Sequence, residues 1–459
     1  MYKDTIAAIS TAVSESGIGI IRISGKDAFS VIDRVYRAKG KKKVLSQEKS
    51  HTIHYGFIHD GEEIIDEVLV MLMRGPRSFT AEDTVEINCH GGVYAMKRIL
   101  DTVLKNGARP AEPGEFTKRA FLNGRIDLSQ AEAVMDVIQA ENEYALKSSV
   151  SQLRGSVYRT IRELREALIY HIAFIESALD DPEHISLEGY PERLSGENEK
   201  WMKKLKILID SAENGRIIKE GIKTVIVGKP NAGKSSLLNA LVGEEKAIVT
   251  DVAGTTRDVL TETISLNGIT LNIVDTAGIR ETKDLVEKIG VERARENVRN
   301  ADLVIYVVDS SIDLDENDEN IIEMLRDKNV IVLLNKTDLD PVITEEMFRD
   351  KMGEYIIIPI SARNETGIEQ LEQTIKDMFY QGEITFNDQV YITNVRQKNL
   401  LIDSLESLRL VKNSIQTGMP EDFFSIDLMS AYESLGGIIG EQTGEDLVNE
   451  IFGKFCMGK

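Results

Sequence analysis

The fold of the central part of this chain is decided by the stretch Thr224-Val225-Ile226-Val227-Gly228-Lys229-Pro230-Asn231-Ala232-Gly233-Lys234-Ser235-Ser236-Leu237-Leu238. An apolar run that fits a buried strand is followed by a glycine-bounded loop and by the start of a helix. The loop matches G-x-x-x-x-G-K-[ST], in which backbone N–H groups cradle phosphates, the lysine reaches the β- and γ-phosphates and the serine hydroxyl binds Mg²⁺. An ordinary glycine-containing turn is the alternative, and the order strand, loop, helix favours the phosphate site.

Three further stretches follow in the order that a GTP-binding domain requires. Residues 271–274 read as a strand that ends in Asp275-Thr276-Ala277-Gly278, where a carboxylate can hold Mg²⁺ through water. Residues 330–334 precede Asn335-Lys336-Thr337-Asp338, and residues 356–360 precede Ser361-Ala362-Arg363. The carboxylate of Asp338 can accept from guanine N1–H and N2–H₂, a donor pair that adenine does not offer. Asn-Lys-x-Asp alone fits a surface turn as well, but the combination predicts GTP with Mg²⁺.

Length, charge and cysteine content restrict the class of protein. A chain of 459 residues is too long for one core, so two or three domains are expected. The formal net charge of −21 argues against a general polyanion binder, so any nucleic acid needs a local patch or a partner. Two cysteines, Cys89 and Cys456, fit a reducing compartment, and no apolar run approaches the roughly 20 residues of a membrane span. The N-terminus does not resemble a signal peptide, and the cytoplasm is the expected compartment.

The first 120 residues alternate short apolar runs with turns, which is typical of a compact α+β domain. Strands are predicted at residues 18–23, 68–72 and 84–89, and helices at 28–35 and 94–104. Cys89 falls inside a strand pattern and is expected in the core. The basic run 39–43 fits a solvated loop, with phosphate binding as the alternative.

Helical patterns dominate from Leu128, and Ser129 with Glu132 fits a capping box. Apolar residues then recur in steps of three and four from residue 146 to residue 179, which predicts one helix of about 50 Å. Pro182 would end that helix, and helical patterns resume at residues 395–415 and 428–452. The predicted fold is multi-domain: an N-terminal α+β domain, an all-α helical domain and an inserted α/β P-loop GTPase domain of Ras-like type. The expected bounds are 1–120 for the first domain, 121–221 and 380–459 for the helical halves, and 222–379 for the GTPase domain.

Further blocks lie outside the nucleotide motifs. They are Ser78-Phe79-Thr80-Ala81-Glu82-Asp83, His90-Gly91-Gly92, Pro113-Gly114-Glu115-Phe116-Thr117, Ala120-Phe121-Leu122-Asn123-Gly124-Arg125, Asp127-Leu128, Ile248-Val249-Thr250-Asp251-Val252-Ala253-Gly254-Thr255-Thr256-Arg257-Asp258 and Phe455-Cys456-Met457-Gly458-Lys459. With the GTP motifs, they resemble the MnmE-type (TrmE) tRNA-modification GTPases over the whole chain. The resemblance implies a homodimer that works with an FAD-containing MnmG-type partner, as a heterotetramer, on the wobble uridine (U34) of certain tRNAs. It also implies a K⁺-activated GTPase and an N-terminal domain that binds 5-formyltetrahydrofolate or a related folate.

The resemblance assigns roles to residues of this chain. GTP contacts are implied for Asn231, Ala232, Gly233, Lys234, Ser235, Ser236, Thr250, Asp251, Val252, Ala253, Gly254, Thr255, Thr256, Asp275, Thr276, Ala277, Gly278, Asn335, Lys336, Asp338, Ser361, Ala362 and Arg363. Mg²⁺ is implied at Ser235 and Thr256, K⁺ at Asn231, Thr250, Val252 and Thr255, and folate at Arg22, Glu86, Arg125 and Lys459. Catalytic roles are implied for Lys234, Asp275, Glu287 and Cys456.

Several of these assignments have plain alternatives. Ile279 stands where Ras-type GTPases place a water-orienting glutamine, and no arginine finger is identifiable, so a monovalent cation held partly by Asn231 is the natural substitute. Glu287 can equally be a solvated helix carboxylate, and Arg22 and Arg125 would by themselves be read as surface residues. Cys456 can be a nucleophile, a carrier or an inert thiol, while the apolar residues around it favour docking of the terminal segment.

Two other functions fit the GTP motifs. One is a switch GTPase that acts in ribosome or RNA assembly without modification chemistry, although such proteins usually carry a separate RNA-binding module. The other is a dynamin-like structural GTPase that assembles through its helices, although no membrane-binding segment is visible. The sequence favours the tRNA-modifying enzyme.

Overall fold

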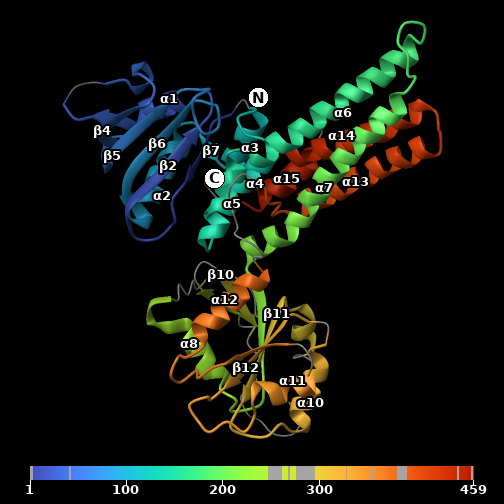
Figure 1. Ribbon diagram of the computed structural model, residues 1–459. Coiled ribbons are helices and arrows are strands. Elements are labelled where there is room, and N and C mark those ends of the chain that lie inside the picture. The colour runs from blue at the N-terminus through green and yellow to red at the C-terminus, as the bar shows by residue number, and fades with distance from the viewer. Residues whose placement is uncertain are drawn as a thin grey trace. The chain divides into compact units, whose positions relative to one another are not determined.

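The computed structural model describes residues 4–40, 43–246, 261–266, 269–274, 295–326, 328–352, 355–379, 390–441, 444–455 and 458. The chain divides into two compact units (Figure 1). The first unit contains residues 1–135, 152–201 and 403–459, and the second contains residues 136–151 and 202–402. Each unit is therefore built from segments that are far apart in the sequence.

A seven-stranded sheet forms the N-terminal part of the first unit, with strand order β3-β4-β5-β6-β2-β1-β7. The bounds are β1 (Ile6–Ile9), β2 (Ser16–Ser24), β3 (Tyr36–Ala38), β4 (Thr52–Asp60), β5 (Glu63–Met73), β6 (Thr84–Gly91) and β7 (Arg109–Pro110). All neighbouring strands are antiparallel except β1 and β7. Gly61, with φ +64°, closes the hairpin between β4 and β5, a conformation that glycine adopts without steric cost.

The two faces of this sheet are covered differently. Helices α1 (Ala28–Val35) and α2 (Val93–Lys105) pack on one face, where the larger core lies, and a short 3₁₀ turn, η1 (Leu45–Gln47), adds Leu45 to it. Cys89 is buried in this core, which confirms the prediction for that residue. Helix α3 (Glu115–Leu122) contributes Phe116 to a small cluster with Ile6 and Ala8, which alternate with the core-facing Ala7.

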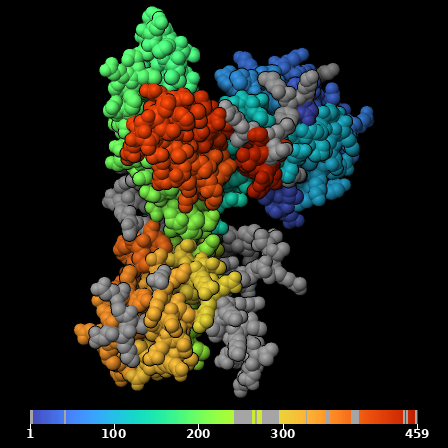
Figure 2. Space-filling model, turned by 90° about the vertical axis from the view of Figure 1, so that its right-hand side faces the viewer, coloured from blue at the N-terminus to red at the C-terminus, as the bar shows by residue number. Residues whose placement is uncertain are grey.

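The helical part contains two breaks that the apolar pattern does not predict. The bounds are α4 (Leu128–Ile138), α5 (Glu143–Leu153), α6 (Ser156–Asp180), α7 (Tyr190–Glu220), α13 (Val395–Gln416), α14 (Glu421–Ile439) and α15 (Glu445–Gly453). The expected helix over 146–179 is wrong, because Gly155 is left-handed (φ +81°) and separates α5 from α6. Gly440 (φ +88°) likewise ends α14, so residues 428–452 are not one helix. Over most of α6 the predicted apolar stripe is buried, and this helix packs against α14. Figure 2 shows the red surface of the C-terminal helices beside the green surface of α6.

The start of α4 corrects a second expectation. Asp127, not Ser129, caps this helix: its Oδ1 accepts from the backbone N–H groups of Ser129 (2.8 Å) and Gln130 (3.2 Å). The Oε1 atom of Gln130 accepts in turn from the backbone N–H of Asp127 at 3.1 Å. A capping box is therefore present, two residues earlier than predicted.

The second unit is an α/β fold around a six-stranded sheet, with strand order β13-β12-β11-β8-β10-β9. The strands are β8 (Ile222–Val227), β9 (Thr261–Leu266), β10 (Ile269–Val274), β11 (Leu303–Asp309), β12 (Val330–Asn335) and β13 (Ile356–Pro359). All pairs are parallel except the edge pair β9–β10. The central strands β11 and β12 are buried throughout, as expected of parallel strands covered on both faces.

Helices cover both faces of this sheet (Figure 1). Helices α8 (Lys234–Lys246) and α12 (Ile368–Phe379) pack on one face through Leu237 and Leu371. Helices α10 (Glu316–Met324) and α11 (Glu345–Met352) cover the other face, where Phe348 is buried. The three predicted parts of the fold class are thereby confirmed. No helix in the described residues is long and apolar enough to cross a bilayer.

Candidate functional site

The phosphate-binding loop lies between β8 and α8, at the carboxyl end of a central strand. Gly228 has φ +152° and Gly233 has φ +101°. A Cβ on Gly228 would overlap the carbonyl oxygen of Val307, and one on Gly233 would overlap the side chain of Asn335. Both positions therefore require glycine for close approach as well as for backbone conformation.

Lys234 is the first residue of α8, and its side chain folds back over the loop. The ammonium donates to the carbonyl oxygens of Gly228 and Lys229, both at 2.7 Å. Burial lowers the pKa of Lys234, and no carboxylate in the described residues pairs with it. Ser235 and Asn231 are exposed beside it, and Asn231 has φ +63°. The loop thus presents a cation and a hydroxyl at a helix N-terminus, the arrangement that binds phosphates.

Asn335 joins this loop to the segments 335–338 and 361–363, which the sequence predicts to contact guanine. Its Nδ2 donates to the carbonyl oxygen of Ala232 at 2.8 Å, and its Oδ1 accepts from the N–H of Ala362 at 3.0 Å. Asn335 is 3% exposed, so both contacts are made away from water. The side-chain amide of Asn335 therefore links the predicted phosphate loop to the loop that is predicted to contact the base.

Asp338 is exposed at the end of the same segment and is oriented by Ser361, whose hydroxyl donates to Oδ1 at 2.7 Å. This hydrogen bond, with Arg363 and Lys336 nearby, lowers the pKa of Asp338. The carboxylate is thus ionised at neutral pH, as acceptance from the two guanine donors requires. Lys336, with φ +68°, is held by Asp309 at 2.5 Å.

Part of the expected site lies outside the described residues. These residues are Thr250, Asp251, Val252, Ala253, Gly254, Thr255, Thr256, Asp275, Thr276, Ala277, Gly278, Glu287, Cys456 and Lys459.

A second candidate site lies on the α3 side of the seven-stranded sheet. Arg22 on β2 and Glu86 on β6 are cross-strand partners, and Arg22 Nε donates to Glu86 Oε1 at 2.8 Å. The guanidinium of Arg22 lies 5.2 Å from the ring centroid of Phe79, and that of Arg125 lies 5.0 Å from the same ring. Nη1 of Arg22 is buried without a hydrogen-bond partner, and within the described chain no carboxylate pairs with Arg125. Two guanidinium groups around one aromatic ring suit a ligand that is both planar and anionic.

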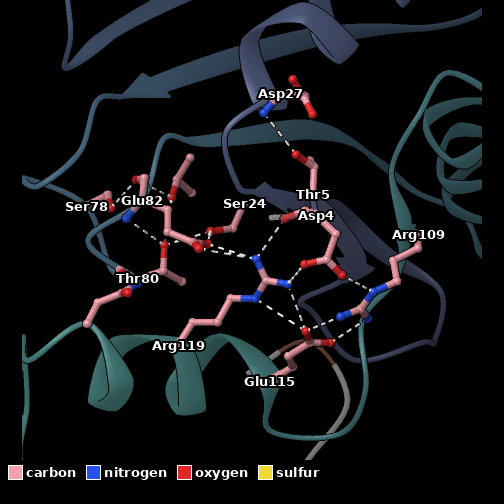
Figure 3. Close-up of polar contacts among 12 residues, drawn as sticks. Asp4, Thr5, Ser24, Asp27, Ser78, Thr80, Glu82, Arg109, Glu115 and Arg119 are labelled. Atoms are coloured by element: carbon pink, nitrogen blue, oxygen red, sulfur yellow. Dashed lines mark hydrogen bonds and ion pairs between the residues drawn. The ribbon is translucent and has the colours of Figure 1, made fainter. Parts of the chain in front are cut away.

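Beside this site lies a charged network that sequence reasoning missed (Figure 3). Arg119 is fully buried, and its guanidinium contacts Asp4 (2.9 Å), Glu115 (2.9 Å) and Glu82 (3.2 Å). Arg109 also pairs with Asp4 and Glu115. Because Glu82 accepts from Ser24 Oγ at 2.8 Å, the network ties α3 and the 78–83 segment to β2, the strand that carries Arg22. The available sequence signal was the i, i+4 pair Glu115–Arg119 on the face of α3 that also carries Phe116 and Ala120.

The C-terminal segment is docked on the same part of the first unit. Phe452 and Phe455 are buried, and Ser10 Oγ donates to the carbonyl oxygen of Gly458 at 2.9 Å. Gly114, the N-cap of α3 with φ +67°, lies so close that a Cβ would be 2.5 Å from the carbonyl oxygen of Phe452. Helix α15 packs against α3, and the docked residues Phe455 and Gly458 lie on either side of positions 456 and 457 in the sequence.

The fold and the phosphate-binding site define a P-loop GTPase unit combined with a sheet domain and long helices. A family model described as "GTP-binding protein TrmE N-terminus" matches residues 5–125, and one described as "MnmE helical domain" matches residues 128–456. The chain belongs to the MnmE family of tRNA modification GTPases, which confirms the predicted family and enzyme class.

Relatives match along the whole chain. The tRNA modification GTPase MnmE of Lachnoclostridium phytofermentans is 60% identical over 459 residues, which is 100% of both chains. That of Listeria welshimeri is 47% identical over 460 residues, again 100% of both chains. A solved structure of Era from Aquifex aeolicus covers 41% of this chain and 67% of its own, with 29% identity and a TM-score of 0.29.

Proposed function

We propose that this chain is a K⁺-dependent GTP hydrolase that acts with an FAD-containing MnmG-type partner on tRNA. Together they add an aminomethyl or carboxymethylaminomethyl group at C5 of the wobble uridine, with a folate as one-carbon source. The single observation that carries the nucleotide part is the joint at Asn335, which couples a phosphate loop to a base-reading loop. The tRNA part rests on family membership and on relatives named tRNA modification GTPase. The proposed compartment is the cytoplasm, where tRNA is found, and the proposed assembly is a homodimer within a heterotetramer.

In the proposed reaction each described residue has a limited task. Backbone N–H groups of residues 231–236 and the Lys234 ammonium bind the phosphates, and Ser235 with Thr256 would hold Mg²⁺. Asn231 would hold K⁺ with Thr250, Val252 and Thr255, and the ion would supply positive charge to the phosphates. Asp338 selects guanine, while Asp275 and Glu287 are proposed to act on Mg²⁺ and on the attacking water.

The folate part is supported by the buried donor Nη1 of Arg22, which has no hydrogen-bond partner, and by Arg125, which pairs with no carboxylate among the described residues and lies over the ring of Phe79. A glutamyl tail offers carboxylates to such groups, and Glu86 offers an acceptor to the donor edge of a pterin. Lys459 would contribute at the terminus. Cys456 is proposed to lie near this ligand, because Phe455 and Gly458 on either side of it are docked. We further propose the domain bounds 1–120, 121–221 with 380–459, and 222–379.

The modification is tested in a strain that lacks the gene. Mass spectrometry of tRNA nucleosides should show unmodified wobble uridine, restored by the wild-type chain and not by the Asp338→Asn variant. A full set of modified uridine in the deletion strain would reject the function and favour a switch GTPase in RNA assembly.

The two ligand assignments are tested separately. Asn231→Ala should abolish the stimulation of GTP turnover by K⁺ over Na⁺, whereas Asn413→Ala, an exposed asparagine on α13, should keep it. Equal wild-type turnover in both salts would refute the K⁺ role. Calorimetric titration with 5-formyltetrahydrofolate should show binding that Arg22→Gln weakens and Arg98→Gln, at a surface ion pair with Glu63, does not. No heat with the wild type would refute the folate site.

A further inference from the structure

Lys229 occupies a variable position of the phosphate-loop motif, yet its side chain is strongly held. Its ammonium lies 2.6 Å from Asp318 Oδ2 and 3.1 Å from Asp315 Oδ2, both on or next to α10. The side chain of Lys229 is 12% exposed and that of Asp318 is 1% exposed. Because the pair is shielded from water, removal of either partner would leave the other as a buried charge without compensation, which is costly.

The two carboxylates that accept from Lys229 are themselves held by hydrogen bonds. Asp318 Oδ1 accepts from the buried hydroxyl of Tyr306 on β11 at 2.7 Å, and Oδ2 also accepts from the N–H of Asp315 at 2.9 Å. Asp315 in turn caps α10 by accepting from the N–H of Asn317 at 2.9 Å. Both carboxylates are therefore fixed by the start of α10, and they set the position of the Lys229 ammonium.

The backbone of Lys229 continues the chain of contacts into the nucleotide site. Its carbonyl oxygen is one of the two acceptors that the described residues offer to the ammonium of Lys234, the loop lysine that contacts phosphates in this motif. Burial opposes the positive charge of Lys229, but the hydrogen bonds that its ammonium donates to Asp318 and Asp315 outweigh this effect and raise the pKa of Lys229. The lysine is thus charged at neutral pH, as the tie to α10 requires.

We propose that Lys229 is a positioning residue of the phosphate-binding loop, and that Asp318 on α10 sets through it how tightly the loop holds the nucleotide phosphates. A shift of α10 would move the Lys229 backbone and with it one acceptor of Lys234. This inference rests on the proposed binding of GTP by the loop. It assigns to helix α10 an influence on the affinity of the loop for the nucleotide.

The test uses the full-length protein and the dissociation of a fluorescent GDP analogue in stopped flow. Lys229→Met removes the positive charge. Lys229→Arg keeps the charge, so the GDP analogue should dissociate from this variant at the wild-type rate. Lys229→Met and Asp318→Asn should each speed dissociation by about tenfold, which corresponds to about 1.4 kcal/mol of lost binding energy. The KM for GTP should rise with little change in kcat, because the loop contacts phosphates in ground and transition states alike.

Tyr306→Phe is the matched control, because it removes a hydrogen bond to Asp318 and leaves Lys229 paired with it. Thermal unfolding of all variants shows how much each change costs in stability. If Tyr306→Phe speeds dissociation as much as Lys229→Met at equal loss of stability, the role is merely structural and the proposal is overturned. Dissociation from Lys229→Met within twofold of wild type overturns it as well. A wild-type protein that does not bind the analogue would instead refute the nucleotide function itself.

Discussion

The close approach of Gly114 to the C-terminal segment allows a sharp test of how that segment is held. Gly114 and Gly124 flank α3, with φ of +67° and +71°. Alanine in this region of backbone space costs about 1–2 kcal/mol at either position. Only at Gly114 would the new Cβ meet other atoms, 2.5 Å from the carbonyl oxygen of Phe452 and 2.7 Å from Cβ of Phe455, whereas Gly124 has open space around it.

The difference between the two variants therefore isolates the contact with the C-terminal segment. Overpacking of this kind typically costs about 1–3 kcal/mol, so Gly114→Ala should shift the docking equilibrium toward the open state by about 5- to 150-fold. Gly124→Ala should leave it unchanged. The apolar cluster that Val448 and Phe452 of this segment form with Ala120 and Leu128 would then be exposed more often.

Hydrogen exchange followed by mass spectrometry is the appropriate assay, because it measures local opening without requiring the whole protein to unfold. Peptides that cover α15 should exchange faster in Gly114→Ala than in Gly124→Ala, while peptides that cover β11 and β12 should not differ. If Cys456 acts in the docked C-terminal segment, tRNA modification should be lower in Gly114→Ala than in Gly124→Ala. Equal exchange of α15 in the two variants would refute the reasoning, because the predicted overlap would then have no consequence.

Three further predictions follow from the two sites. Asn335→Ala should weaken GTP binding by about tenfold or more, since loss of two buried hydrogen bonds costs about 1 kcal/mol each, and an unchanged Kd in a fluorescence titration would contradict it. Arg119→Met should lower the free energy of unfolding in urea by about 3–5 kcal/mol, because three carboxylates lose their buried partner, with Arg119→Lys less severe. Burial raises the pKa of Glu115, but Arg109, the Glu112 N–H and Arg119 outweigh it and the pKa is lowered. Its contribution to stability should therefore be complete above the unfolded pKa of about 4.3 and lost as pH falls further, and Glu115→Gln should flatten that dependence.

Features encoded by adjacent residues could be predicted from the sequence. The phosphate loop needs only a strand, two glycines and a helix start in order, so Gly228 and Gly233 are found where the motif expects them. The strands and short helices of the first domain also follow their local apolar periodicity. Gly155 shows the limit of that method, because a periodic apolar stripe continues across it while the backbone reverses into the left-handed region. Periodicity reports which face is buried, and it is insensitive to a single residue that interrupts the hydrogen-bond ladder.

Contacts between distant segments could not be predicted in the same way. Arg119 meets Asp4, which is 115 positions away, and Asn335 meets Ala232, which is 103 positions away. The local sequence marks Asn335 and Ala232 as motif residues and Arg119 as an ordinary polar residue, and only the folded chain shows which distant residue each one contacts. Lys229 was missed for a related reason: the motif treats its position as variable, although its partners on α10 fix its side chain.

The distribution of charge at the GTP site explains how a chain with a net charge of −21 can bind a nucleotide triphosphate. Lys229 and Lys336 are each neutralised by carboxylates, at Asp318 and Asp309, so they add little to a general attraction for anions. Lys234 differs, because its contacts in the described part of the chain are carbonyl oxygens and no carboxylate there pairs with it. Among the described residues, attraction for phosphate therefore comes from the ammonium of Lys234 and from the oriented backbone N–H groups at a helix start. Such a site recognises the shape of a bound phosphate chain, and it does not require the basic surface of a general polyanion binder.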